Sequence, residues 1–556
     1  MLSSERGGER PWGLPSAIRP ELSFTAKGSK AFAKWLENLP LLNIQESVQH
    51  INQALEEVMR LNSGTGERLE LLQQIYPIAM YLSNQLTEQD LKEISSANAS
   101  YQGKTYLSHS LLWRVSMAFQ TIWIDTTVNL TNENRPHALM SGCYVLNCAF
   151  ELLKRYALLY LEPPEIYWAR SVELIKMAKD FNLADEPLTV NSVSSSTLST
   201  AFFAIVLMDL SELASLSRRE ATLVGKEIIN WANKIRWIAP VLDSWVIDLV
   251  TGSLPERVRS GMDYSTSTVA IDISELEAEI ERIFNIWGTN TQRKVNGPAP
   301  ATLKYLLDTW SRPKSRRFTR ASIFEPVPIQ VTVGASHISQ WLALKEKEMF
   351  PDQIQSINYS LSDFKEKKLV DIVNDAIVMD TSRGGYRIKF NFYTDLLQLE
   401  PGEVVLVDLG VNLPPNLAEV RWLKREADGL TAGVNIISYA VQHHTMLAFD
   451  HLKSEEENIP LLAFLLTPFA GETVSEEQER LAILVPSRYA TYLMQSMGTS
   501  PAQGWPLIKK LLFNHAHWSI FEAAGKHHLH WIKSLTTLER LGMTVGMKYL
   551  RQSMKR

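Results

Sequence analysis

The amino-acid sequence predicts a multidomain α-plus-β protein: a large all-α N-terminal region, a small antiparallel β-barrel and a mixed α/β C-terminal segment. From about residue 30 to residue 310, apolar residues recur at three- and four-residue steps, as they do in amphipathic helices. From 311 to 440 the chain instead carries short alternating or β-branched segments separated by turn residues, which is the pattern of strands. The chain of 556 residues is long enough for two to four domains.

The N-terminal segment, residues 1–29, is polar and rich in Gly and Pro, which predicts disorder. It contains no apolar stretch that resembles a signal peptide. The longest apolar runs, 201–208 and 460–466, are shorter than the roughly 20 residues of a membrane-spanning helix. We therefore expect a soluble, cytoplasmic protein that does not insert into a membrane.

The helical region, residues 30–310, is well represented by its segment 43–62, in which Asn43 and Glu46 have the spacing of an N-cap and its reciprocal partner. Pro77 is expected to punctuate this pattern. No fixed repeat length appears, so we predict a helical interaction domain rather than a solenoid. The same helical periodicity recurs in 67–83, 107–125, 138–160, 166–181, 197–215, 218–235 and 270–287.

Two cysteines, Cys143 and Cys148, lie in one of these helical segments. Their i, i+5 spacing places them on different helix faces, so neither a disulfide nor a metal knuckle is expected. We predict two free, buried thiols, which fits a reducing cytoplasm.

The β region contains six short segments with strand character, and the C-terminal extension, 441–556, reads as mixed β and α. The six segments are PVPIQVTVG (326–334), AIVMD (376–380), YRIKFNF (386–392), EVVLVDL (403–409), AEVRWLKR (418–425) and TAGVNIISYA (431–440). In the extension, 461–468 and 480–489 are predicted strands, 505–515 suits either state, and 530–556 is predicted to be a basic helix.

The net charge is −5, with a sequence pI near 6.2. A protein that binds DNA nonspecifically is usually basic, so no DNA partner is expected and any anion site must be local. Such a local site stands immediately before the first predicted strand, in RPKSRRFTR (312–320). Arginine suits an anion or a guanine because its planar fork pairs bidentately with phosphate or with the O6/N7 edge.

A second polar cluster, DTSRGGYRIKF (380–390), places an Asp-x-Ser-x-x-Gly pattern at the start of a predicted strand. Together with the Arg-x-x-x-Arg of Arg316 and Arg320, this order resembles the PilZ domain, the bacterial receptor module for cyclic di-GMP. The resemblance covers about 312–440, since the strand-like segments after the motifs also match. It implies an antiparallel barrel that binds cyclic di-GMP as a ligand and needs no cofactor.

The resemblance also implies a role for each motif residue. Arg316 and Arg320 would bind phosphate and guanine through charge-assisted hydrogen bonds. Asp380 would accept hydrogen bonds from guanine N–H groups, and Ser382 would present a hydroxyl to ligand or backbone. Gly385 would allow a backbone angle or a close approach that a Cβ blocks. The secondary candidates for ligand contact are Arg312, Arg317, Arg383 and Gly384.

Each motif taken alone has a simpler interpretation. The arginine cluster is typical of a solvated linker, and DTSRGG is typical of a hairpin turn. Arg421 and Trp422 are interpreted as a surface charge and a core aromatic. The two motifs stand about sixty residues apart, more than the family's usual spacing, and the excess includes a polar, helical-looking insertion, 336–353.

Five histidines fall within sixteen residues of the C-terminal extension, but their spacing matches no catalytic pattern, so we expect a surface turn and no metal. They are His515, His517, His527, His528 and His530. The sequence has no P-loop, no G-x-S-x-G elbow and no cyclase or phosphodiesterase signature, so we expect no enzyme activity.

The sequence thus favours a cytoplasmic receptor that couples cyclic di-GMP binding at the Arg-rich junction to a protein partner of the helical region. The alternative is a PilZ-like scaffold that no longer binds nucleotide. A metal-dependent enzyme centred on the histidines is the third hypothesis.

Overall fold

The chain folds into two compact units, Met1–Leu213 with Ala221–Pro313 and Ala214–Glu220 with Lys314–Arg556, and each is described by itself. The computed structural model describes residues 11–15, 18–26, 28–93, 101–188, 196–258, 264–265, 267–288, 297–311, 321–334, 337–338, 340–342, 373–382, 384–390, 399–410, 415–426, 429–449, 458–469, 481–486, 507–514 and 518–524.

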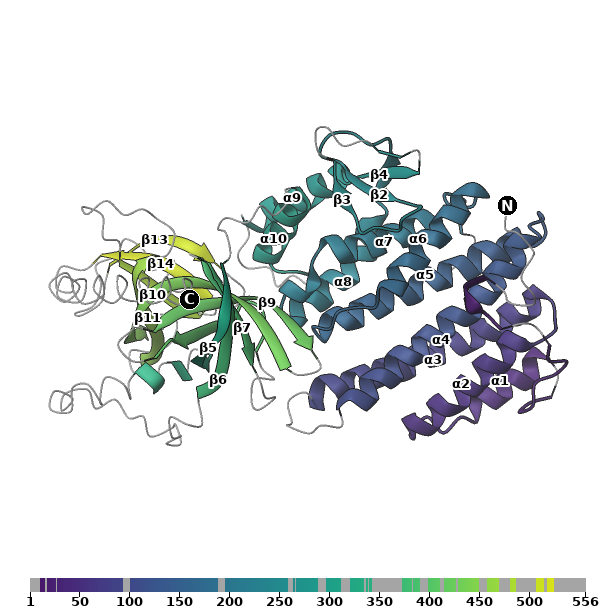
Figure 1. The fold of residues 1–556 in the computed structure, drawn as a ribbon, viewed down its shortest axis with the longest axis horizontal. Coiled ribbons are helices and arrows are strands. Elements are labelled where there is room, and N and C mark those ends of the chain that lie inside the picture. Colours follow the sequence, from purple (N-terminus) through teal and green to yellow (C-terminus); the bar gives the residue numbers. More distant parts are fainter. Residues whose placement is uncertain are drawn as a thin grey trace. The chain divides into compact units, whose positions relative to one another are not determined.

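The first unit is built mainly from helices, and its long helices α3, α4 and α5 run side by side (Figure 1). The helices are η1 (Pro11–Gly13), α1 (Ser29–Glu37), α2 (Ile44–Arg60), α3 (Thr65–Glu93), α4 (Tyr101–Val128), α5 (Arg135–Leu158), α6 (Glu165–Asp180), α7 (Leu198–Leu210), η2 (Leu213–Ser215), α8 (Arg218–Ala232), α9 (Ser274–Gly288) and α10 (Pro300–Ser311). The predicted helical region is therefore confirmed.

The start of α2 follows the predicted capping pattern. The side chain of Asn43 accepts a hydrogen bond from the Glu46 amide at 3.4 Å and donates one to the Glu46 carboxylate at 2.9 Å. Pro77 lies inside α3, which continues through it, as the predicted helical segment 67–83 also does. A proline inside a helix removes one backbone hydrogen bond, and here the buried face of α3, which includes Ile75 and Ala79, stabilises the continuous helix.

Helix α7 is the most apolar element of this unit and lies in its core. A window from Leu198 to Ser215 is long and apolar enough to cross a membrane by length and composition, but 78% of it is buried within the structure. Cys143 and Cys148 on α5 are free and buried, as predicted. Burial raises the pKa of the Cys143 thiol to about 12, so it stays protonated at neutral pH.

A small antiparallel sheet, which the sequence analysis did not predict, lies between α8 and α9. Its strands are β1 (Arg236–Ile238), β2 (Trp245–Asp248), β3 (Glu256–Arg257) and β4 (Thr268–Asp272), in the order β1-β4-β2-β3. Strands of two to five residues are too short to produce a recognisable alternation. The Trp245 indole N–H holds the sheet to α10 by donating to the Trp310 carbonyl at 3.0 Å.

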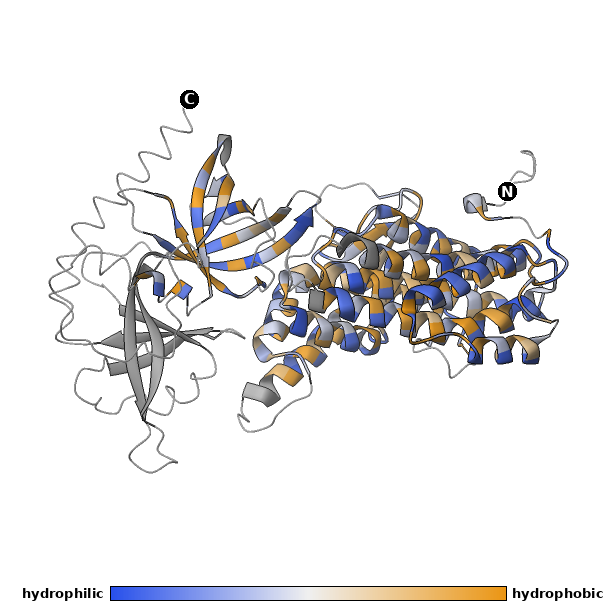
Figure 2. Cartoon of the chain, turned by 90° about the horizontal axis from the view of Figure 1, so that it is seen from below, coloured by the Kyte–Doolittle hydropathy of each residue, from blue (hydrophilic) through white to orange (hydrophobic). Residues whose placement is uncertain are grey.

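The second unit contains a closed six-stranded antiparallel barrel, and all six predicted segments lie on its strands. The strands are β5 (Ala321–Val333), β6 (Val373–Ser382), β7 (Gly385–Phe390), β8 (Val404–Asp408), β9 (Asn416–Glu426) and β10 (Gly429–Phe449). Their order is β10-β7-β6-β5-β8-β9, and β9 pairs with β10 to close the circle. Apolar and polar residues alternate along these strands (Figure 2), and inward side chains such as Ile388 and Leu423 are buried.

The sheet continues beyond the barrel through the second half of β10. The further strands are β11 (Asn458–Phe469), β12 (Leu481–Pro486), β14 (Trp518–Ala524) and β13 (Leu507–Asn514), in that order. The two predicted strands of the extension are confirmed, and 507–514, which suited either state, is a strand. The predicted helix 530–556 lies outside the described residues, as does most of the insertion 336–353, whose described residues 337–338 and 340–342 are helical.

Candidate nucleotide-binding site

The Asp-x-Ser-x-x-Gly motif forms the tip of the hairpin that joins β6 to β7. Strand β6 ends at Ser382 and β7 begins at Gly385, and these two residues face each other in the ladder. The Ser382 hydroxyl accepts a hydrogen bond from the Gly384 amide and donates one to the Gly385 carbonyl, each at 3.3 Å. The Ile436 amide of β10 donates to the Gly384 carbonyl at 2.9 Å. Hydrogen bonds within the turn and one from strand β10 therefore stabilise it.

Gly385 is required by the close approach of β10. A Cβ at this position would lie 2.0 Å from the Val434 carbonyl oxygen and 3.2 Å from the Asn435 Cα. Both contacts are to backbone, which cannot move aside as a flexible side chain can. The glycine that the motif supplies thus has a role inside the protein, independent of any ligand.

Asp380 lies on the outer face of the hairpin and pairs with a cation that the sequence analysis did not single out. Its cross-strand partner on β7 is Arg387, and Nε of Arg387 lies 2.9 Å from Oδ2 of Asp380. The carboxylate side chain is 11% exposed, whereas that of Arg387 is 42% exposed. The alternation in YRIKF indicates that Arg387 points outward. A register shift between Val378 and Asp380 places Asp380 opposite Arg387.

The register of β5 places the first residues of this strand beside the hairpin. Ala321, the first residue of β5, pairs with Thr381, and Ser322 pairs with Asp380. Ala321 directly follows Arg320 in the chain. The predicted arginines Arg312, Arg316, Arg317 and Arg320, and Arg383 of the turn, lie outside the described residues.

One row of residues crosses four strands on the outer face: Asp380, Arg387, Gly433 and Trp422. A Cβ on Gly433 would lie 2.1 Å from Nε1 of Trp422, so the indole covers the glycine. Trp422 is half-buried there, rather than part of the core as expected. Arg421 is exposed and pairs with Glu419 at 3.1 Å, which agrees with its interpretation as a surface charge.

A titratable carboxyl with a shifted pKa lies beside β8. Burial raises the pKa of Glu403 to about 7, and the nearby charge of Glu400 adds to the increase. One hydrogen bond from the Glu400 amide to the Glu403 carboxylate, at 3.3 Å, opposes it. This carboxyl therefore changes charge near neutral pH.

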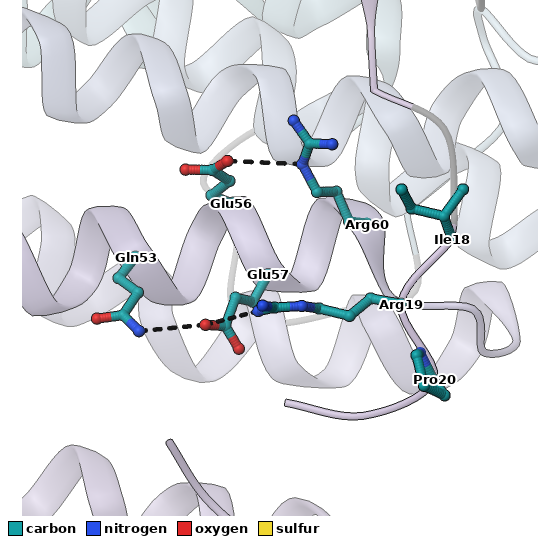
Figure 3. A pocket seen from close by; sticks show the side chains of 7 residues that line it. All are labelled: Ile18, Arg19, Pro20, Gln53, Glu56, Glu57 and Arg60. Atoms are coloured by element: carbon teal, nitrogen blue, oxygen red, sulfur yellow. Dashed lines mark hydrogen bonds and ion pairs between the residues drawn. The ribbon is translucent and has the colours of Figure 1, made fainter. Parts of the chain in front are cut away.

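A pocket of about 590 Å³ lies on the helical unit, where the segment before α1 crosses α2 (Figure 3). Arg19 pairs with Glu57 at 2.6 Å, and Arg60 lies 3.5 Å from Glu56. Burial alone would raise the pKa of Glu57, but hydrogen bonds from Ser23, Arg19 and Gln53 outweigh it and lower the pKa to about 2. Because these acids and arginines compensate one another, we assign no ligand to this pocket.

No group of three or more His, Cys, Asp or Glu side chains is arranged to hold a metal ion in the part of the chain that the structure describes. The five histidines of the extension, His515, His517, His527, His528 and His530, lie outside that part.

The comparison with protein-family models found a match for the helical region. Residues 30–240 match the model described as "Cyclic-di-GMP receptor FimW, N-terminal domain". The helical region is therefore similar to the N-terminal domain of this receptor family. The matched residues extend from α1 through α8 to β1. Searches of curated proteins and of solved structures found no match.

The barrel that follows the helical region is consistent with a PilZ-like domain. The predicted order of a helical region and a PilZ-like barrel is therefore confirmed, and the family model that matches the helical region is that of a cyclic di-GMP receptor. The family match covers α1 to β1, whereas the hairpin with Asp380 lies in the barrel. The roles of the individual site residues remain a prediction.

Proposed function

We propose that this chain is a non-enzymatic receptor that binds cyclic di-GMP at the β6–β7 hairpin and passes the signal to a protein partner of its FimW-type helical domain. The observation that carries the proposal is the register of β5 against β6. Ala321, which directly follows Arg320 in the chain, pairs with Thr381, and Ser322 pairs with Asp380. The family match to cyclic di-GMP receptors supports the choice of ligand.

The chemistry of the motif residues fits this ligand. Cyclic di-GMP presents two phosphates and two guanines, and arginine binds both groups with geometric specificity. In our proposal Arg316 and Arg320 clamp the nucleotide against the hairpin, and the Asp380 carboxylate accepts hydrogen bonds from guanine N–H groups. Binding that orders an arginine-rich loop then changes which surface the protein presents to a partner. We propose a cytoplasmic location for this receptor.

Isothermal titration of the full chain with cyclic di-GMP tests the proposal. We expect saturable binding by the wild type and its loss in the Arg316→Ala/Arg320→Ala double variant. The matched control, Arg236→Ala/Arg282→Ala, removes the same charge from two exposed arginines of the helical unit and should bind like the wild type. A hundredfold excess of nucleotide over Kd should stabilise the fold by about 2.7 kcal/mol. A folded wild type that shows no binding would contradict the proposal.

One observation favours the alternative function, a PilZ-like scaffold that acts through protein contacts alone. Ser382 closes the turn, Gly385 accommodates Val434, and Asp380 pairs with Arg387, so each described motif residue already has a role within the protein. The alternative predicts a melting temperature that does not respond to cyclic di-GMP and a partner that co-purifies with and without nucleotide.

A further inference from the structure

Arg387 lies on the outer face of the hairpin between a carboxylate on one neighbouring strand and a glycine on the other. On the β6 side the neighbour is Asp380, and on the β10 side it is Gly433, which has no side chain. The Nε atom is buried and lies 2.9 Å from Oδ2 of Asp380, and this contact is an ion pair without the alignment of a hydrogen bond. Because 42% of the side chain is exposed, that exposure belongs to atoms other than Nε.

The outer end of this guanidinium has N–H groups to offer. Arginine carries five N–H donors, and its Nε–H is only one of them. Within the described residues, no hydrogen bond or ion pair involves Nη1 or Nη2 of Arg387. The Trp422 indole covers Gly433, the neighbour of Arg387 on β10.

The charge balance of the site also favours a role for Arg387 in nucleotide binding. Cyclic di-GMP carries two negative phosphates, and a carboxylate in its site repels them unless a cation compensates it. Arg387 supplies such a cation, because its guanidinium forms an ion pair with the Asp380 carboxylate.

We propose that Arg387 is a ligand-binding residue of this site: it fixes and neutralises Asp380 through Nε and donates its terminal N–H groups to a phosphate oxygen of the bound nucleotide. The inference rests on the proposed function, since it concerns the same ligand and the same hairpin. It adds a third guanidinium to the two that the sequence motif supplies.

The test measures the Kd of the full chain for cyclic di-GMP at three NaCl concentrations, for the wild type, Arg387→Ala, Arg387→Gln and Arg387→Lys. Loss of a charge-assisted contact should weaken binding about tenfold or more in R387A and R387Q. It should also make Kd less sensitive to salt, because salt screens one attractive charge fewer. R387K keeps the charge without the fork and should fall between these variants and the wild type.

The matched control is Arg421→Ala. Arg421 is an outer-face arginine with similar exposure, 45%, and it also pairs with a carboxylate, that of Glu419 on the same strand. R421A should bind like the wild type at every salt concentration. The melting temperature of each variant without nucleotide shows whether it is folded. If R387A does not fold, the Kd of R387Q alone tests the inference.

Three results would overturn the inference. Wild-type affinity in both R387A and R387Q would exclude Arg387 from binding while leaving the proposed function intact. Weaker binding with the salt sensitivity of the wild type would mean that Arg387 acts only through Asp380 and makes no phosphate contact. A wild type that does not bind cyclic di-GMP would end the proposed function and this inference together.

Discussion

Ala321 pairs with Thr381, so the strand that begins immediately after Arg320 lies beside the hairpin that carries Asp380 and Ser382. The strand pairing thus joins the first residues of β5 to a hairpin that stands about sixty residues further along the chain. The long insertion between them is compatible with this pairing, because the entropy of loop closure rises only slowly with loop length.

Gly385→Ala should destabilise the barrel. The added Cβ would lie 2.0 Å from the Val434 carbonyl oxygen, so the β7–β10 ladder must shift to admit it. We expect a loss of about 2–4 kcal/mol in the free energy of unfolding, measured by urea denaturation of the full chain. Gly64→Ala is the control, because no atom lies within 4 Å of the Cβ it would add. A G385A protein as stable as G64A would contradict the role assigned to this glycine.

Asp125→Ala should destabilise the helical unit. Nη2 of Arg68 lies 2.6 Å from Oδ2 of Asp125, and the Arg68 side chain is only 4% exposed. Removing the carboxylate leaves a buried cation without its partner, which costs about 3–5 kcal/mol. Glu279→Ala breaks the exposed pair with Arg282 and should change stability by less than about 1 kcal/mol. Equal effects of the two substitutions in thermal unfolding would disprove the distinction.

Glu57 should make the helical unit sensitive to acid. Its pKa is lowered from 4.5 to about 2, so its ionised form stabilises the folded state above about pH 4.5. This contribution is lost as the pH falls from 4.5 through about 2. Glu57→Gln should therefore cost up to about 3 kcal/mol at pH 6, and progressively less at pH 4 and pH 3.

Glu56→Gln provides the matched control for this acid sensitivity. Glu56 lines the same pocket, but it is 54% exposed and 3.5 Å from its partner Arg60. Its substitution should leave the pH dependence of unfolding unchanged, and an E57Q profile parallel to that of the wild type would refute the prediction.

Glu403 should have the opposite effect on the pH dependence of stability. Burial raises its pKa from 4.5 to about 7, so the folded state favours the protonated carboxyl. The stability that this proton contributes is complete below about pH 4.5 and is lost as the pH rises to about 7. Glu403→Gln mimics the neutral form, so it should be more stable than the wild type at pH 8 and equal to it near pH 4.5. Melting curves at both pH values check this, and a constant difference between the two proteins would contradict it.

Much of the fold could be predicted because its elements are long enough to show a period. The six barrel strands alternate clearly, and the Asn43–Glu46 pattern marks the start of α2. The small sheet was not predicted, because its strands, from two residues in β3 to five in β4, are too short to show a clear alternation. The predicted segment 431–440 ends at Ala440, yet strand β10 continues to Phe449.

The site was only partly predictable, because some of its contacts depend on register. The sequence motif identified Asp380, Ser382 and Gly385. A glycine is needed at 385 because the Val434 carbonyl, about fifty residues further along the chain, leaves no room for a Cβ. The pairing of Arg387 with Asp380 follows from a bulge near Met379 that sequence periodicity does not reveal.

The length of β10 has a practical consequence for anyone who wishes to isolate the barrel. Its first half completes the barrel with β7 and β9, while Ser438–Phe449 pairs with β11. A fragment cut at residue 440 would sever this strand and strip the rest of the sheet of its neighbour. Exposed strand edges template self-association, so a truncated fragment would tend to aggregate, whereas one that ends after Ala524 retains every described strand with its partners.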